Sequence, residues 1–166
     1  MLDVLFEDNH LLVVNKPSGL LVQGDATGDA SLPDLVKEYL REKYNKPGNV
    51  FAGVVHRLDR PVSGVVLLAK TSKALSRMNE QFRTNKVHKT YLAVTLKRPP
   101  QEENCLIHWL IKDPERNTTK AYNTEKNQSQ RAELSYKLLN QQEKYFLIQL
   151  VILEWPRLEA EMYLLE

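Results

Sequence analysis

Short apolar stretches separated by turn residues predict a chain rich in β-strands. Strands show alternating or continuous apolar residues over about four to eight positions, whereas helices repeat apolar positions every three to four residues. The turn at residues 7–10 joins the first two predicted strands as a hairpin. The predicted strands are residues 2–6, 11–15, 65–69, 87–96, 106–111, 132–139 and 145–153.

Two helices are predicted from capping residues and helical spacing. Ser31 is an N-cap candidate, Asp34 follows three residues later as in a capping box, and Pro33 suits the first turn. Residues 45–48 end this helix. Ser72 is the expected cap of a second helix. The apolar positions that share one helical face are Leu32, Leu35, Val36, Tyr39 and Leu40 in the first helix and Leu75, Met78 and Phe82 in the second.

Many strands, few helices and no regular alternation of the two predict an α+β fold with a mixed, largely antiparallel β-sheet flanked by a few helices. A length of 166 residues suits one domain, so residues 1–166 are expected to form a single domain.

Composition restricts the function only weakly. The formal net charge is +2 and 27% of residues are charged, which permits an acidic partner such as RNA without requiring one. The one cysteine, Cys105, excludes an intrachain disulfide and is expected to be a buried core thiol. No apolar run approaches the ~20 residues that span a membrane, and the acidic start lacks signal-peptide features, so a cytoplasmic protein is expected.

The densest chemistry lies in residues 56–64, HRLDRPVSG, where Asp59 stands between Arg57 and Arg60, with His56 three residues before it. Neighbouring cations favour an ionised carboxylate, which can be a nucleophile, a general base or a metal ligand. No cluster of further ligands accompanies Asp59, so no metal is expected. Arginine binds phosphate bidentately, which favours an RNA backbone as partner. The alternative is a surface ion pair worth about 0–1 kcal/mol, the commoner situation on composition alone.

The residues around Asp59 resemble the signature of the RluA-type RNA pseudouridine synthases, in which this block holds the catalytic aspartate. Val62 departs from the threonine usual there. The resemblance covers about residues 2–150, and no S4 domain is expected before them. Further blocks in family order are residues 11–24 (LLVVNKPSGLLVQG), 65–71 (VVLLAKT), 82–93 with its Lys-x-Tyr ending, and 110–117.

This resemblance implies the pseudouridine synthase catalytic fold and the isomerisation of specific uridines to pseudouridine in structured RNA, either rRNA or tRNA. The target nucleotide is flipped out of its stack, and no cofactor or metal is implied. Asp59 would act at the sugar, by attack on C1′ or by removal of the C2′ proton. Tyr91 would stack on the target base and assist proton transfer, although an ordinary strand tyrosine is more often a core residue.

The resemblance also implies RNA-binding residues. Arg57 would enter the space vacated by the flipped base, and Arg60 would position Asp59 or bind phosphate. Lys89 shares a strand face with Tyr91 and would bind phosphate. Lys16 would approach the RNA backbone or the active-site loop, with a solvated turn lysine as the alternative. His56 is expected to orient the loop through a hydrogen bond.

The C-terminus departs from the family pattern. After residue 153 the family continues with Thr-Gly-Arg and Gln-x-Arg motifs, which supply an arginine that pairs with the catalytic aspartate. Here residues 154–166 read EWPRLEAEMYLLE, so the fold is expected to be missing or rewritten after about residue 153, by truncation, frameshift or divergence. An exposed sheet edge would then permit a dimer. Two rival functions follow: a catalytically inactive RNA-binding remnant, and an unrelated metal-dependent hydrolase that uses Asp59.

Overall fold

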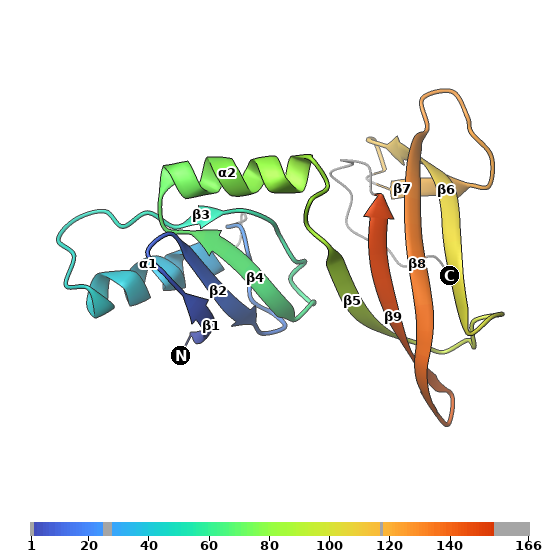
Figure 1. The fold of residues 1–166 in the computed structure, drawn as a ribbon, viewed down its shortest axis with the longest axis horizontal. Coiled ribbons are helices and arrows are strands. Elements are labelled where there is room, and N and C mark those ends of the chain that lie inside the picture. Colours follow the sequence, from blue (N-terminus) through green and yellow to red (C-terminus); the bar gives the residue numbers. More distant parts are fainter. Residues whose placement is uncertain (1, 25–27, 117, 155–166) are drawn as a thin grey trace. The chain divides into compact units, whose positions relative to one another are not determined.

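The computed structural model describes residues 2–24, 28–116 and 118–154. Its contacts divide the chain into two compact units, Met1–Thr84 and Asn85–Glu166, and each unit contains its own sheet (Figure 1). The single catalytic domain expected for residues 1–166 stays a prediction. The predicted rewriting of the chain after residue 153 falls on residues 155–166, which lie outside the described part.

The first unit is built on a four-stranded antiparallel sheet with the strand order β1-β2-β4-β3. The predicted hairpin is present, because β1 and β2 are neighbours joined by a short turn. In that turn Asp8 accepts hydrogen bonds from the backbone N–H groups of His10 and Leu11. The strands are β1 (Asp3–Glu7), β2 (Leu11–Lys16), β3 (Gly53–Val54) and β4 (Gly64–Ala69).

Helix α1 (Leu32–Lys43) covers one face of this sheet. The predicted capping box is present: the backbone N–H of Ser31 donates to Asp34 at 3.2 Å. Burial of an aliphatic side chain is worth about 1.5–3 kcal/mol, so this apolar layer holds the first unit together. The fully buried side chains of the layer are Leu12, Val14, Val66 and Leu68 from the sheet and Leu32, Val36 and Leu40 from the helix or its first turn.

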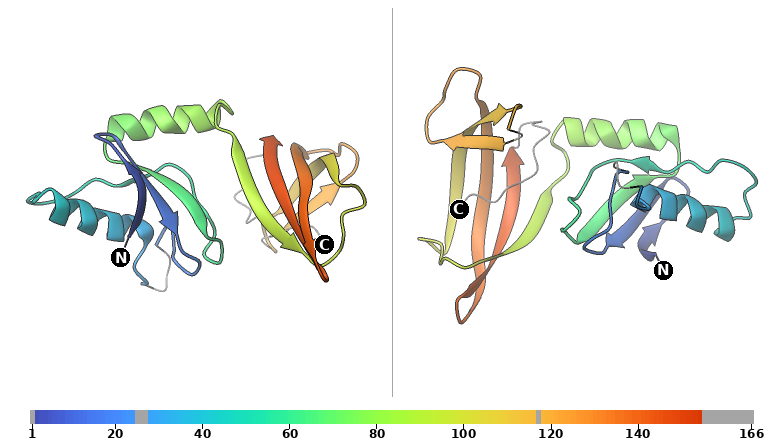
Figure 2. Two further views of the ribbon diagram at one scale, coloured as in Figure 1. Left: turned by 60° about the horizontal axis from the view of Figure 1, so that its bottom comes forward. Right: turned by 180° about the vertical axis from the view of Figure 1, so that it is seen from behind.

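Helix α2 (Ser72–Arg83) covers the opposite face. Val54 packs into the core under α1, so its strand neighbour Gly53 faces the other way. A Cβ atom at Gly53 would lie 2.9 Å from Leu75 of α2, which shows how closely this helix approaches the sheet. The views of Figure 2 agree with this arrangement. The predicted cap Ser72 is wrong by one residue, because the hydroxyl of Thr71 accepts the capping bond from the N–H of Ala74.

The second unit is a five-stranded antiparallel sheet with the strand order β5-β9-β8-β6-β7 (Figure 1). Its core cluster is formed by Tyr136, Ile148 and Leu150, with Tyr91 and Ala93 packed against it. The strands are β5 (Lys89–Thr95), β6 (Glu103–Asp113), β7 (Thr118–Tyr122), β8 (Gln130–Gln142) and β9 (Tyr145–Glu154).

The predicted α+β class is confirmed, with named strands that pair antiparallel throughout the described residues. Sequence reasoning missed β3 and β7, since a two-residue strand carries no period and β7 mixes polar and apolar positions. The expected burial of Cys105 is wrong. The side chain lies exposed on β6, where its thiol donates to Glu133 at 3.3 Å.

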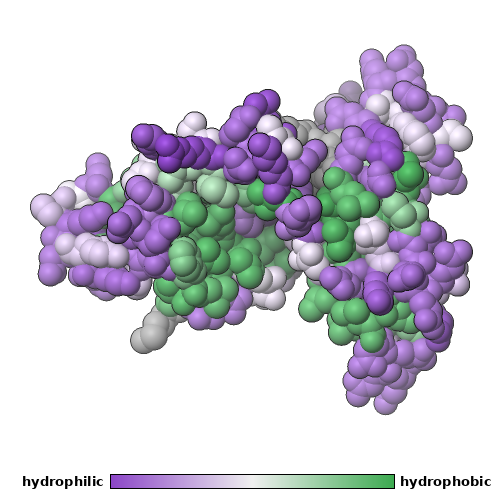
Figure 3. All heavy atoms as spheres, in the orientation of Figure 1, coloured by the Kyte–Doolittle hydropathy of each residue, from purple (hydrophilic) through white to green (hydrophobic). Residues whose placement is uncertain are grey.

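Both sheets leave apolar side chains exposed, seen as green areas in Figure 3. Leu5, Phe6 and Val65 are exposed on the first sheet, and Leu92 and Val94 on the edge strand β5. The dimer through a sheet edge stays a prediction. No helix in the described residues is long and apolar enough to cross a bilayer. The cytoplasmic location also stays a prediction.

Candidate active site

Asp59 lies in the loop that connects β3 to β4 in the first unit. The neighbouring Leu58 packs against the apolar core and anchors the loop. The carbonyl oxygen of Asp59 accepts a 3.0 Å hydrogen bond from the N–H of Val62, which closes a tight turn. At the end of the loop Gly64 has φ +140°, a conformation that side-chain-bearing residues rarely adopt. The side chain of Asp59 is thus held half-buried on an anchored turn.

A second loop, residues 17–24 after β2, is hydrogen-bonded to the Asp59 loop. The N–H of Gly19 donates to the carbonyl oxygen of Arg60 at 2.7 Å, and the hydroxyl of Ser18 donates to that of Pro61 at 2.7 Å. The side chain of Arg60 returns a 3.2 Å bond to the carbonyl oxygen of Gly19. Gly19 has φ +89°, so the turn needs glycine there. Two loops far apart in sequence are therefore bonded to each other at the residues that directly follow Asp59.

Lys16, the last residue of β2, is fully buried between these loops. Its ammonium group donates to the carbonyl oxygens of Pro17, Leu20 and Arg60 at 3.1, 2.8 and 3.3 Å. Burial lowers the pKa of Lys16, and the negative charge of nearby Asp59 acts in the opposite direction. Lys16 is therefore not a solvated turn lysine. Its bond to Arg60 fits the predicted approach to the active-site loop, and binding of RNA by Lys16 stays a prediction.

The two arginines that flank Asp59 are exposed. Arg57 donates to the side chain of Gln23 at 2.9 Å, and Arg60 forms an ion pair with Asp29 at 2.7 Å. Both members of the Asp29 pair are about half-exposed, so the pair is weak and a phosphate could replace the carboxylate. The RNA-binding roles of Arg57 and Arg60 stay predictions.

His56 fixes the start of the loop, as expected. Its Nε2 atom accepts a 3.1 Å hydrogen bond from the backbone N–H of Leu67, at the position on β4 just beyond the pairing with β3. This bond requires an unprotonated Nε2. The imidazole also stacks on Phe82 of α2, with 5.2 Å between ring centroids. His56 thereby connects the loop to the sheet and to a helix.

Tyr91 and Lys89 belong to strand β5 of the second unit, where they share one half-buried face. Tyr91 packs against the cluster of Tyr136, Ile148 and Leu150, so at least part of its ring has the core role that is common for tyrosine. Asp59 belongs to the first unit, and the joint use of these three residues in one site stays a prediction.

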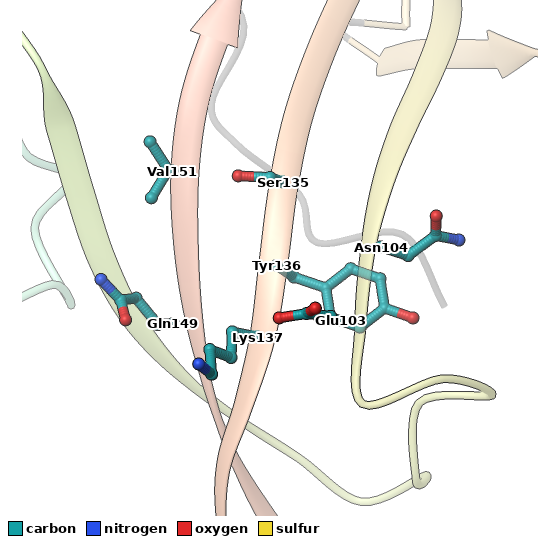
Figure 4. Close-up of a pocket in the computed structure, with 7 residues that line it drawn as sticks. All are labelled: Glu103, Asn104, Ser135, Tyr136, Lys137, Gln149 and Val151. Carbon is teal, nitrogen blue, oxygen red and sulfur yellow. The ribbon is translucent and has the colours of Figure 1, made fainter.

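Two hollows lie elsewhere on the described surface. One is on the second sheet, lined by side chains of β6, β8 and β9 that include Ser135, Lys137 and Val151 (Figure 4). The other lies in the first unit and includes Pro17, Glu38 and Tyr39. Neither is lined by Asp59, its flanking arginines, Tyr91 or Lys89. The described residues contain no group of three or more potential metal-ligating side chains.

Sequence reasoning identified the Asp59 loop but missed its supports. Ser18 and Gln23, from the motif block of residues 11–24, and Asp29, which belongs to no motif, contact this loop. The one available signal was the Lys-Pro-Ser-Gly turn, which was recognised as a motif. Its contact with the loop became visible only in the fold.

Most of the described chain matches proteins of one family. The family model described as RNA pseudouridylate synthase matches residues 10–154. The chain is 44% identical over 91 residues to ribosomal large subunit pseudouridine synthase C of Buchnera aphidicola, and 42% identical over 93 residues to tRNA pseudouridine synthase C of Haemophilus ducreyi. These matches cover 55% and 56% of this chain but only 27% and 36% of the two relatives.

Solved structures show the same fold. Human RNA pseudouridylate synthase domain containing 4 superimposes with a TM-score of 0.76 at 23% identity, covering 93% of this chain and 60% of the human one. Human RNA pseudouridylate synthase domain containing 1 gives a TM-score of 0.72 at 17% identity. The match over residues 10–154, together with this fold, shows that the chain belongs to the RNA pseudouridine synthase family of the RluA type.

Proposed function

We propose that this chain isomerises uridine to pseudouridine in structured RNA, with Asp59 as the catalytic residue. The observation that supports this most is the half-buried carboxylate of Asp59, carried on a tight turn beside two exposed arginines and a buried ammonium group. An ionised carboxylate in such surroundings suits attack on, or proton removal from, a ribose. The relatives named for ribosomal and transfer RNA make both classes candidate substrates.

The reaction is an isomerisation that needs no external reactant. The target nucleotide leaves the base stack at a cost of a few kcal/mol. Asp59 then acts at the sugar, by attack on C1′ or by taking the C2′ proton, and the bond between C1′ and N1 breaks. The uracil turns and C5 bonds to C1′, while the Asp59–C1′ bond breaks in the first route or the C2′ proton returns from Asp59 in the second. The C5 proton then leaves and N1 gains a proton. Asp59 is released unchanged.

The remaining predicted residues assist catalysis or bind RNA in this proposal. Tyr91 stacks on the target base, a contact worth about 1–3 kcal/mol, and assists proton transfer. Arg57 occupies the space left by the flipped base. Arg60 and Lys89 bind phosphates. Neither a cofactor nor a metal takes part.

A second candidate is an inactive RNA-binding remnant of the same family. The matched segments cover 27% and 36% of two curated relatives, so catalysis by this chain is itself part of the proposal. The remnant would bind RNA through the same arginines without turning over uridine. The two candidates therefore differ in chemistry rather than in RNA affinity.

Release of tritium from RNA labelled at C5 of uridine separates them, because the C5 hydrogen leaves when C5 bonds to C1′. The proposal expects time-dependent release by the wild-type chain and none above background by Asp59→Asn, a substitution that preserves side-chain shape. Circular dichroism checks that both proteins fold. Equal release by the two folded proteins would overturn the proposal.

A further inference from the structure

Lys16 has surroundings that are unusual for a lysine. Its relative exposure is 0%, whereas lysine is among the residues least often fully buried. A buried ammonium group must be compensated by hydrogen bonds or by opposite charge. Lys16 has both, in three carbonyl acceptors and in the nearby negative charge of Asp59. Such a costly group indicates a specific role.

The three acceptors come from two segments of chain. Pro17 and Leu20 belong to the turn that follows Lys16, and Arg60 belongs to the Asp59 loop, 44 residues away. An ammonium group has three donors, and these three carbonyls use them all. Lys16 therefore joins its own turn to the catalytic loop through its single side chain.

The contact with Arg60 fixes one particular peptide group. The peptide between Arg60 and Pro61 has no N–H because proline lacks one, so its carbonyl oxygen is its only hydrogen-bonding atom. That oxygen accepts from Gly19 at 2.7 Å and from Lys16 at 3.3 Å, which uses both of its lone pairs. Both donors thus hold the residue directly after Asp59.

We propose that Lys16 is a positioning residue, whose buried ammonium group holds the Arg60 carbonyl and thereby sets the orientation of the Asp59 carboxylate. The inference rests on the proposed function of Asp59. A displacement of about 1 Å at a reacting group can cost about 100-fold in rate, so loss of this tie acts on the chemical step rather than on RNA binding.

Lys70 provides a matched control at the other end of the same sheet. Its side chain is 8% exposed and its ammonium group pairs with Glu7 at 2.6 Å. Its ammonium group donates to Glu7, to the carbonyl oxygen of Asp8 and to Tyr44, all outside residues 56–64. Loss of either ammonium group destabilises the first unit, whereas only loss of Lys16 releases the Asp59 loop.

The experiment compares Lys16→Met with Lys70→Met in the full chain by two readouts. Amide hydrogen exchange at Gly19 and Val62 reports the two loops without any need for activity. We expect exchange at these amides to be at least ~10-fold faster in Lys16→Met than in Lys70→Met. The single-turnover rate on C5-tritiated RNA should fall ~100-fold only in Lys16→Met, while the Kd for that RNA changes by less than ~3-fold.

Equal exchange in the two variants would overturn the positioning role, as would a rate loss that only follows Kd or the folded fraction. If the exchange difference is present but the wild-type chain releases no tritium, Lys16 does hold the Asp59 loop, and it is the proposed function that fails.

If Lys16→Met does not fold, Lys16→Cys in a Cys105→Ser background replaces it. Aminoethylation of the unfolded chain before refolding restores an ammonium group at this position. Recovery of slow exchange and of rate in the aminoethylated protein supports the proposal, and no recovery relative to the unmodified cysteine contradicts it.

Discussion

The backbone N–H of Gly19 donates a 2.7 Å hydrogen bond to the carbonyl oxygen of Arg60, across 41 residues of sequence. This bond places the Lys-Pro-Ser-Gly turn directly against the turn that carries Asp59. Ser18 and Lys16 add further bonds between the same segments. Hydrogen bonds from three residues of the Lys-Pro-Ser-Gly turn therefore hold it against the candidate catalytic loop.

Gly64→Ala should destabilise the protein through its backbone. With φ at +140°, an alanine there is strained by about 1–3 kcal/mol. Urea unfolding should show this loss, with lower activity because Gly64 ends the Asp59 loop. Gly24→Ala is the control, since it has no positive φ and no neighbour within 4 Å, and its effect should be small. Equal stability of the two variants would refute the strain argument.

Asp29→Asn should strengthen RNA binding, because Asp29 occupies the guanidinium group of Arg60. Both side chains are about half-exposed, so the free energy of unfolding should change by less than about 1 kcal/mol. At low salt the Kd for a short RNA hairpin should fall a few-fold. Arg60→Gln should weaken binding and reduce the slope of log K against log salt by about 1.

Asp29→Glu, which keeps the charge, serves as the control and should bind as the wild type does. If Asp29→Asn binds no more tightly than Asp29→Glu at any salt concentration, Arg60 is not a phosphate ligand.

Glu7 should make the first unit sensitive to acid. Burial alone would raise the pKa of Glu7, but hydrogen bonds from Lys43, Lys70, Tyr44 and Tyr39 outweigh it and lower the pKa to about 2. A carboxylate whose folded pKa lies below its unfolded value stabilises the fold above about pH 4.5. That stabilisation, at most about 3 kcal/mol, is lost as the pH falls from about 5 towards 2.

Urea unfolding at several pH values tests this dependence. Between pH 5 and pH 3 the wild-type chain should lose more stability than Glu7→Gln. Parallel pH profiles for the two proteins would show that Glu7 is not the group responsible.

Local features of the fold could be predicted from sequence, and features made by tertiary contact could not. The capping box of Ser31 and Asp34 depends on neighbouring residues, so the pattern sufficed. The bond from Lys16 to Arg60 joins residues 44 positions apart, so the sequence left open whether this lysine contacts the loop, the RNA backbone or solvent. The burial of Cys105 was predicted wrongly because side chains along a strand alternate between the two faces of the sheet, and Cys105 lies on the exposed face of β6.

The same distinction between local patterns and tertiary contacts applies to the candidate site. Asp59 was found because its loop concentrates charge and matches a family motif, and His56 was correctly expected to orient that loop by a hydrogen bond. The contacts of Ser18, Gln23 and Asp29 with the loop followed no period or charge pattern. These contacts form only when the chain folds and brings the two segments together.

Tritium release from C5-labelled uridine in RNA tests the role of Asp59 most directly. The wild-type chain should release label with time, and Asp59→Asn should lose at least about 1,000-fold of the rate, about 4 kcal/mol of barrier, while still binding RNA. Release by folded Asp59→Asn at the wild-type rate, or none by the wild-type chain, would contradict the account.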